Sequence, residues 1–302
     1  MISPRILAIV AAFAASFIYG INHTIAKGLM PSVISPYGFI LLRVGGAAVI
    51  FWAISLFYKK ETIQTTDWMR SIACAFFGMV LNMTMFFKGL SLSTPINSSV
   101  VITIAPVLLL VLSGVFLKER ITIIKALGIA LGLAGALALI LFGEKTQPNA
   151  PNIPLGNMLF LVNAASYSIY LIIVKPLTAK YSAITLMKFF FLFALMINIP
   201  IGYHEFLRVD WVDLELETIG QLAFVVVGTT VLTYLFNIYA LKQLSPSVVG
   251  VFMYLQPLIA TIFAILTGAD TLTTIRVLAA TLIFLGVYLT TLKKSKVQTS
   301  NT

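Results

Sequence analysis

Long apolar runs alternate with short polar segments along the whole chain. Each run approaches the roughly 20 mostly apolar residues that a membrane-spanning helix needs. The segments between the runs are too short to form a water-soluble domain. The pattern therefore predicts an all-α membrane protein with ten transmembrane helices, at about residues 5–26, 36–57, 70–88, 95–117, 122–142, 155–175, 183–203, 219–240, 246–267 and 274–292.

Composition strengthens this interpretation. Hydrophobic residues make up 60% of the chain and charged residues 10%, and the mean hydropathy is +1.02. An average soluble domain carries about 25% charged residues, so a soluble globular protein is excluded. The first run follows Arg5 like a secretory signal, but it is too long and ends in Asn22-His23 without a small-residue cleavage pattern. We predict that it is retained as the first span.

The basic residues are distributed unevenly between the two sides of the membrane. With the N-terminus inside, 13 of the 20 Lys and Arg residues fall on the cytoplasmic side and 5 on the other, while Arg43 and Lys188 lie within spans. This bias predicts that both termini are cytoplasmic. The net charge of +10 is then a topology signal and not a nucleic-acid-binding patch. We predict a multi-pass protein of a bacterial inner (cytoplasmic) membrane.

The chain also contains an internal repeat. Pro95 and Pro106 are repeated as Pro246 and Pro257, in each case 151 residues later. The same offset relates other pairs, among them Glu119 and Asp270, Lys125 and Arg276, and Gly135 and Gly286. Near the start of each half, Tyr19 and Lys27 are related to Tyr167 and Lys175 by an offset of 148.

Each predicted half has five spans, and an odd number makes the second half enter the membrane from the opposite side. The sequence thus predicts two inverted-topology repeats, an architecture of many secondary transporters. We assign residues 1–145 to the first repeat, 153–294 to the second, and 295–302 to a polar cytoplasmic tail.

The ends of the two halves resemble a known family. They read APVLLLVLSGVFLKERITIIKALGIALGLAG and QPLIATIFAILTGADTLTTIRVLAATLIFLG. A proline-centred helix, a short acidic turn and a Gly-containing final helix are similar to the EamA type of the drug/metabolite transporter superfamily. The resemblance covers nearly the whole chain. Ala105 and Gln256 depart from it, because a Glu often precedes the proline in that family, and the second turn has Gly268-Ala269-Asp270-Thr271 instead of Gly-Glu-Arg.

The resemblance implies a secondary transporter of small organic metabolites, an exporter of amino acids or related compounds, that works by alternating access. Three alternatives stay open: an exchanger of nucleotide-sugars or phosphorylated metabolites, a lipid-handling membrane protein, and a receptor. The expected partners are a small-molecule substrate and the lipid bilayer, without nucleic acid, and the chain is expected to be a monomer or a weak homodimer.

Polar side chains within the spans predict where the substrate binds, because polar groups in hydrocarbon are costly unless they face the bundle interior. Ser99, Thr103 and Pro106 share one face of the fourth span, at spacings of four and three residues. Interhelical hydrogen bonding is the alternative for any one of these groups. The predicted chamber residues are Tyr19, Asn22, His23, Asn82, Phe86, Ser99, Thr103, Asn163, Tyr167, Tyr170, Thr233, Tyr234, Asn237, Tyr254 and Gln256.

Prolines and charged residues give further candidates. Pro95, Pro106, Pro246 and Pro257 are candidate helix breaks or hinges, with simple packing kinks as the alternative. Lys27, Arg43 and Lys88 are candidate charges of an outer vestibule, although Arg43 also suits a role in capping backbone carbonyls, and the two lysines suit membrane anchoring. His23 suits a proton or substrate group, or an interfacial position.

Several chemistries find no support. No predicted span contains Asp or Glu, which argues against proton exchange through a buried carboxylate. There is no metal-ligand cluster, no phosphate-binding glycine loop and no catalytic constellation, and Cys74 is the one cysteine. We therefore expect neither an enzyme nor a cofactor or metal. Gly128, Gly132 and Gly135 in the fifth span predict a close helix contact, within the bundle or at a dimer face.

Overall fold

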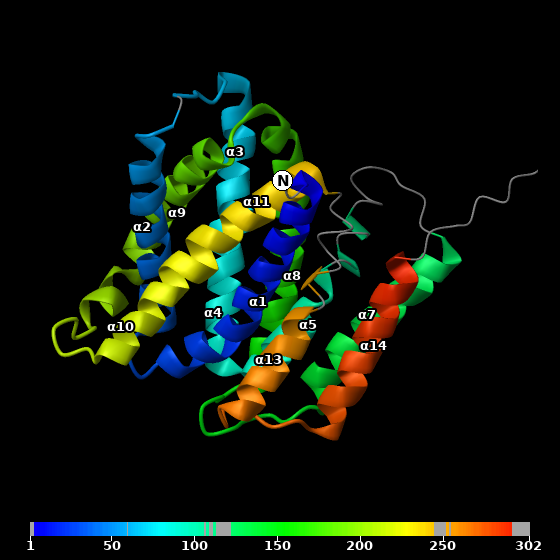
Figure 1. The fold of residues 1–302 in the computed structure, drawn as a ribbon. Coiled ribbons are helices and arrows are strands. Elements are labelled where there is room, and N and C mark those ends of the chain that lie inside the picture. Colours follow the sequence, from blue (N-terminus) through cyan, green and yellow to red (C-terminus); the bar gives the residue numbers. More distant parts are fainter. Residues whose placement is uncertain are drawn as a thin grey trace, which may run out of the picture.

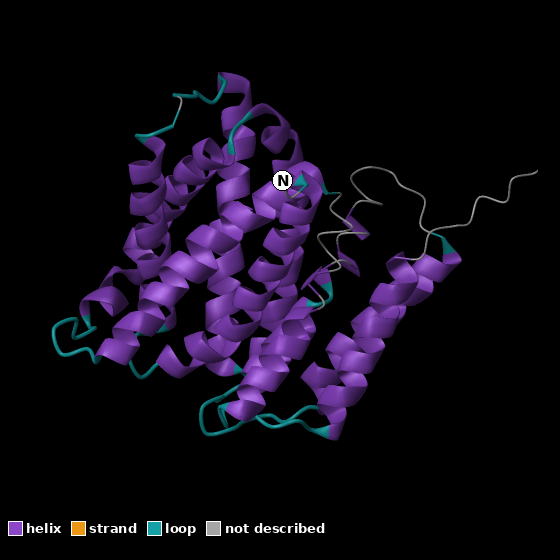
Figure 2. Ribbon diagram, in the orientation of Figure 1, coloured by secondary structure: helices purple, strands orange, loops and turns teal. Residues whose placement is uncertain are grey.

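The computed structural model describes residues 3–58, 60–105, 107–108, 111–112, 122–244, 252–253 and 255–291, and the regular elements in these ranges are helices without strands (Figure 2). The predicted all-α fold is therefore confirmed. Pro106, Pro246 and Tyr254 lie outside the described residues. The helices are α1 (Pro4–Leu29), α2 (Pro36–Ser55), η1 (Thr65–Asp67), α3 (Trp68–Ala75), η2 (Phe76–Leu81), α4 (Asn82–Leu92), α5 (Pro95–Ile102), α7 (Ile123–Phe142), α8 (Ile153–Lys180), α9 (Ala183–Leu207), α10 (Leu216–Ala223), η3 (Phe224–Leu232), α11 (Thr233–Gln243), α13 (Leu255–Leu266) and α14 (Thr274–Thr291).

Six helical segments of the described chain are long and apolar enough to cross a membrane. They are Pro4–Leu29, Pro36–Ser55, Thr65–Leu92, Ile153–Lys180, Ala183–Leu207 and Leu216–Gln243. Shorter apolar helices occupy the positions of the predicted fifth, ninth and tenth spans. The chain is therefore a multi-pass membrane protein.

Several helices begin at a residue pair that suits a helix N-terminus. Ser3-Pro4, Ser35-Pro36 and Thr94-Pro95 each place a hydroxyl residue at the N-cap and a proline in the first turn, where its missing N–H is not needed. The Thr94 hydroxyl accepts a hydrogen bond from the backbone N–H of Asn97 at 3.3 Å. Local sequence thus sets where these spans start.

The helices pack as pairs that are far apart in sequence, and the α2–α9, α4–α8 and α7–α14 pairs are antiparallel. α2 packs against α9 at one edge of the molecule, and α7 packs against α14 at the other (Figure 1). Between these edges, α1 packs on α11 and α13, and α4 packs on α8. Large buried rings, among them Phe39, Phe51, Phe87, Phe160 and Phe191, fill the interior.

Two spans contain a wide, π-helical turn near their middle. η2 begins at Phe76 and η3 at Phe224, which is 148 residues later, the offset that also relates Tyr19 to Tyr167. Turns of this kind leave backbone groups without their normal partner and are frequent at functional sites.

The helix that begins at Pro95 is interrupted within the predicted span. Regular α-helix ends at Ile102, and Thr103 forms a turn in which its N–H donates to the carbonyl of Val100 at 3.2 Å. Pro106 explains this break, because proline cannot donate to the preceding turn and its ring crowds it. The continuous helical face that we predicted for Ser99, Thr103 and Pro106 is therefore interrupted at Thr103.

At each end of the α2–α9 pair, a carboxylate caps the N-terminus of one helix. Glu205, at the end of α9, accepts hydrogen bonds through Oε2 from the N–H groups of Tyr37 and Gly38, at 2.7 and 3.0 Å, at the start of α2. Glu61, after α2, accepts one from the N–H of Ser182 at 2.8 Å, at the start of α9. A carboxylate suits this place because a helix N-terminus has unpaired N–H groups and a positive dipole end.

Replacing Glu61 with Gln is expected to lower the free energy of unfolding by about 0.5–1 kcal/mol, because the charge at the helix N-terminus is lost. Burial raises the pKa of the Glu61 carboxyl, but hydrogen bonds from Ser182 and Thr185 outweigh it, so that the folded-state pKa lies below the ordinary 4.5. This stabilisation is therefore present above that value and is lost as the pH falls through the lowered pKa. Thermal unfolding in detergent at several pH values measures it.

Asp213→Asn is the control for Glu61→Gln, because Asp213 is exposed in the loop before α10. It should leave the melting temperature unchanged. A Glu61→Gln effect that persists at acid pH would contradict a role of the charge.

Candidate functional site

The centre of the bundle holds four tyrosines and one arginine, which we call the central cluster: Tyr19, Arg43, Tyr167, Tyr170 and Tyr234. They come from α1, α2 and α11, which pack on η3, and from α8, which packs on η2. The ring centroids of Tyr167 and Tyr170 are 5.8 Å apart. Tyr170 and Tyr234 are buried, whereas Tyr19 and Tyr167 are half-buried. The structure thus brings together four of the tyrosines predicted for the chamber, and the fifth, Tyr254, lies outside the described residues.

Contacts with η2 fix two of these tyrosines. The Tyr234 hydroxyl donates to the carbonyl of Gly78 at 3.1 Å, and its ring packs edge-on against Phe191, with the ring centroids 5.3 Å apart. The Tyr170 ring lies so close to Gly78 that an added Cβ would be 2.5 Å from it. Glycine at position 78 is therefore required for the Tyr170 contact, and the π-helical turn supplies the carbonyl that accepts from Tyr234.

Asn82 and Asn163 contact each other's helices. The Asn163 amide donates to the carbonyl of Asn82 at 2.8 Å, and the Asn82 amide donates to the carbonyl of Asn163 at 3.4 Å. Ser166 adds a bond from its hydroxyl to the carbonyl of Phe77 at 2.7 Å. These groups join α8 to η2 and α4, as the interhelical alternative requires.

Arg43 lies inside the central cluster, with 4% of its surface exposed. Its Nε donates to the Thr230 hydroxyl at 2.9 Å and its Nη2 to the carbonyl of Thr229 at 3.2 Å, both in η3. The guanidinium carbon is 4.7 Å from the centroid of the Phe87 ring. Of the two roles considered from sequence, Arg43 therefore fulfils that of capping a carbonyl.

His23 and Lys27 lie further along α1 and contact the first half of the chain. His23 Nδ1 is 2.6 Å from the Ser98 hydroxyl, and its ring packs edge-on against Phe86 at 5.4 Å. Lys27 Nζ donates to the carbonyls of Leu90 and Ser91, at 2.8 and 3.2 Å, and so caps the end of α4. Lys88 lies over the Tyr37 ring at 5.9 Å.

The remaining candidates differ in how well their polar atoms are paired. The hydroxyls of Ser99 and Thr103 donate to backbone carbonyls of their own segment, and that of Thr233 to the carbonyl of Thr229. The side-chain oxygen of Asn22 is buried without a partner among the described residues. Asn237 is half-buried on α11. Gln256 and Pro257 are buried in α13, and the Gln256 carbonyl lies beside Gly20.

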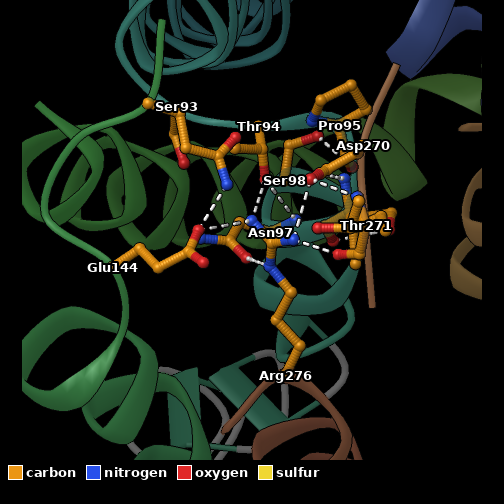
Figure 3. A network of polar contacts seen from close by, with 12 residues as sticks. Ser93, Thr94, Pro95, Asn97, Ser98, Glu144, Asp270, Thr271 and Arg276 are labelled. Atoms are coloured by element: carbon orange, nitrogen blue, oxygen red, sulfur yellow. Dashed lines mark hydrogen bonds and ion pairs between the residues drawn. The ribbon is translucent and has the colours of Figure 1, made fainter. Parts of the chain in front are cut away.

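A second polar group, which we call the end cluster, consists of Thr94, Asn97, Glu144, Asp270 and Arg276 (Figure 3). Arg276 donates to Asp270 Oδ1 at 2.7 Å, to Asn97 Oδ1 at 2.9 Å and to Thr94 Oγ1 at 3.3 Å. It also donates to the carbonyl of Thr271. Glu144 lies 3.6 Å from Arg276 Nη2. Asp270 in turn accepts the N–H of Ile96 at 3.2 Å.

The end cluster ties together three segments: the α4–α5 link, the α7–α8 link and the α13–α14 turn. The sequence does not predict this cluster, because Arg276 falls among the five basic residues of the outer side and Asp270 falls in a turn. The repeat contains a hint of this cluster, because an acidic and a basic residue six positions apart occur in both halves, as Glu119 and Lys125 and as Asp270 and Arg276.

Comparison with known proteins assigns the family. The EamA-like transporter family profile matches residues 6–141 and 154–292. An uncharacterized transporter of Archaeoglobus fulgidus is 29% identical over 288 residues, which cover 95% of this chain and 99% of the relative. The uncharacterized transporter YetK of Bacillus subtilis is 22% identical over 298 residues, covering 98% and 90%.

A protein of known crystal structure shares the fold, with a TM-score of 0.64 and 19% sequence identity. The superposition covers 95% of this chain and 98% of the solved chain. Family relatives are named as transporters, and the apolar helices agree with a membrane transporter of small molecules. Since the family profile matches most of its length, this chain belongs to the EamA-like transporter family.

Proposed function

We propose that this protein is a secondary transporter that exports amino acids or related small organic metabolites across the cytoplasmic membrane. Two inverted five-helix halves, residues 1–145 and 153–294, alternate around the central cluster, with both termini in the cytoplasm. The observation that carries the proposal is the composition of this cluster. α1 and α2 from the first half and α8 and α11 from the second half contribute its side chains, so a molecule bound there would contact both halves.

Three pairs of equivalent features support the inverted repeat. The π-helical turns η2 and η3 begin 148 residues apart. In the α7–α14 pair, Gly286 meets the backbone of Gly128 and Gly132, and Gly135 meets Ala279 and Ile283, which are the same positions shifted by 151 residues. Glu205 of the second half caps the start of α2 in the first half, and Glu61 of the first half caps the start of α9 in the second half.

Side-chain chemistry supports the substrate class. Tyrosine rings provide faces for apolar or cationic parts of a molecule. The unpaired side-chain oxygen of Asn22, one turn beyond Tyr19 on α1, is an acceptor for an ammonium group. Exchange of phosphorylated metabolites fits less well, because Lys27 and Arg276 are engaged by other protein groups.

Counterflow of a labelled metabolite panel into proteoliposomes, at about pH 6 and about pH 8 to detect coupling to protons, tests this proposal. We expect amino acids or close relatives to be transported, and Tyr167→Ala to lower kcat/KM at least about tenfold through loss of a binding contact. Tyr239→Ala is the matched control, because Tyr239 is exposed on α11 and its loss should leave flux unchanged. If no panel member is transported, or if both variants behave alike, the proposal is wrong.

A further inference from the structure

Arg43 is a buried cation without an acidic partner among the described residues. The ion pairs of that part of the chain join Lys180 to Asp67, and Arg276 to Asp270 and Glu144. An unpaired charge within the membrane is costly, and such residues mark substrate or ion pathways. A neutral side chain could donate the same hydrogen bonds to Thr229 and Thr230. The positive charge of Arg43 therefore requires a further explanation.

The known partners of Arg43 leave part of its guanidinium unused. A guanidinium has five N–H donors in a planar fork. One from Nε and one from Nη2 are bound to Thr230 and Thr229. Nη1 and the second N–H of Nη2 have no hydrogen-bond partner in the described part of the protein. Two neighbouring N–H groups of this kind match the two oxygens of a carboxylate.

The surroundings of Arg43 suit a bound organic molecule. Tyr234 on α11 lies about one turn after Thr230, the residue that Arg43 Nε contacts, and α1, which carries Tyr19, packs on η3 and α11. Tyr19 is half-buried, so part of its surface is accessible. A molecule bound between Tyr19 and Tyr234, beside η3, would contact both halves of the protein.

The charge of the site limits which anions fit. Lys27 is held by two carbonyls at the end of α4, and Arg276 is held by Asp270 in the end cluster. Neither belongs to the central cluster. One positive charge balances one carboxylate, whereas a phosphate ester carries up to two negative charges near neutral pH.

We propose that Arg43 binds the carboxylate of the transported molecule, so that the site selects monocarboxylates, with α-amino acids as the class that also uses Asn22. This assignment rests on the proposed transport function and names the group that recognises its substrate. It gives Arg43 a role in addition to capping η3: the two bound donors hold the guanidinium in place, and two of the remaining three, one each from Nη1 and Nη2, meet the ligand.

Binding of matched acids and amides to the purified full-length protein in nanodiscs tests the assignment. The probes are L-phenylalanine, L-leucine and 3-phenylpropanoate, each with its carboxamide. We expect at least one acid to bind about tenfold or more tightly than its amide. Arg43→Gln should weaken binding of that acid about 10- to 100-fold, the effect of one charge-assisted hydrogen bond or more, and change amide binding less than about threefold.

Two further variants separate recognition from structure. Arg43→Lys keeps the charge but not the fork and should retain part of the preference for the acid. Lys188→Gln is the matched control, because the Lys188 ammonium lies over the rings of Trp52 and Phe189, at 5.2 and 5.0 Å from their centroids, and not in the central cluster; it should bind like the wild type. Melting temperatures of all variants report whether they fold.

The outcomes distinguish the two proposals. Loss of acid and amide binding to the same extent in Arg43→Gln would show a structural role alone and overturn the assignment. Absence of acid binding, or of any preference for the acid, in the wild-type protein would overturn it as well. Selective binding without flux in proteoliposomes would leave the Arg43 assignment standing and refute the transport function.

Discussion

Gly286→Ala is expected to lower the free energy of unfolding by about 3 kcal/mol or more, at the upper end of what overpacking costs. A Cβ at position 286 would lie 2.5 Å from the carbonyl oxygen of Gly128 and 2.5 Å from the nitrogen of Gly132. Both are backbone atoms of α7, so a change of rotamer cannot relieve the contact. α14 must instead move away from α7. Size-exclusion chromatography and thermal unfolding in detergent measure the result.

Two other glycines make this prediction specific. Gly135→Ala should also destabilise, because its Cβ would meet the carbonyl of Ala279 at 2.8 Å across the same helix pair. Gly220→Ala on α10 should not, since no heavy atom lies within 4 Å of the added Cβ. Removing a glycine from a helix normally stabilises by roughly 0.5–1 kcal/mol. Equal effects of Gly286→Ala and Gly220→Ala would contradict the packing argument.

This close contact shows what sequence can predict. The offset of 151 that relates Gly135 to Gly286 was evident from the chain, as was the close helix contact of the fifth span. Whether that contact lies within the bundle or at a dimer face was left open. The structure places it between α7 and α14, because two antiparallel helices with small residues at matching depths can approach each other closely.

The central cluster was predictable in composition but not in its contacts. A tyrosine within hydrocarbon must find a polar partner or space inside the bundle, which identified Tyr19, Tyr167, Tyr170 and Tyr234. Their partners depend on η2 and η3. A π-helical turn inserts one residue into the period of a helix, and an apolar run carries no mark of that insertion. The bond from Tyr234 to the Gly78 carbonyl therefore requires the structure.

The end cluster was missed for a different reason. Arg276 and Asp270 are six residues apart across a turn, but the Asn97 side chain that completes the cluster is 179 residues away. Charge counting places arginines on a side of the membrane and does not identify buried partners. Burial of Arg276 to 2% exposure depends on three connecting segments that meet only in the folded chain.

Arg276→Gln is expected to lower the free energy of unfolding by about 3–5 kcal/mol, the usual cost of removing one partner from a buried ion pair. The substitution leaves the Asp270 carboxylate, which is fully buried, without its cation. Asp270→Asn should cost somewhat less, because an amide oxygen can still accept the N–H of Ile96. Glu144→Gln should have little effect, since the Glu144 side chain is 43% exposed and 3.6 Å from Arg276.

The double variant Asp270→Asn/Arg276→Gln decides whether the two residues act as one unit. Removing the carboxylate together with its cation leaves no buried unpaired charge, so the combined loss should be smaller than the sum of the single losses by about 1–3 kcal/mol. Lys180→Gln is the matched control on the other ion pair. Its lysine is 49% exposed, so its loss should cost less than about 1 kcal/mol. Strict additivity of the Asp270 and Arg276 effects in thermal unfolding would refute the coupling. In that case Asp270 and Arg276 would act through their separate hydrogen bonds to Ile96 and Asn97 of α5, and not as a coupled charge pair.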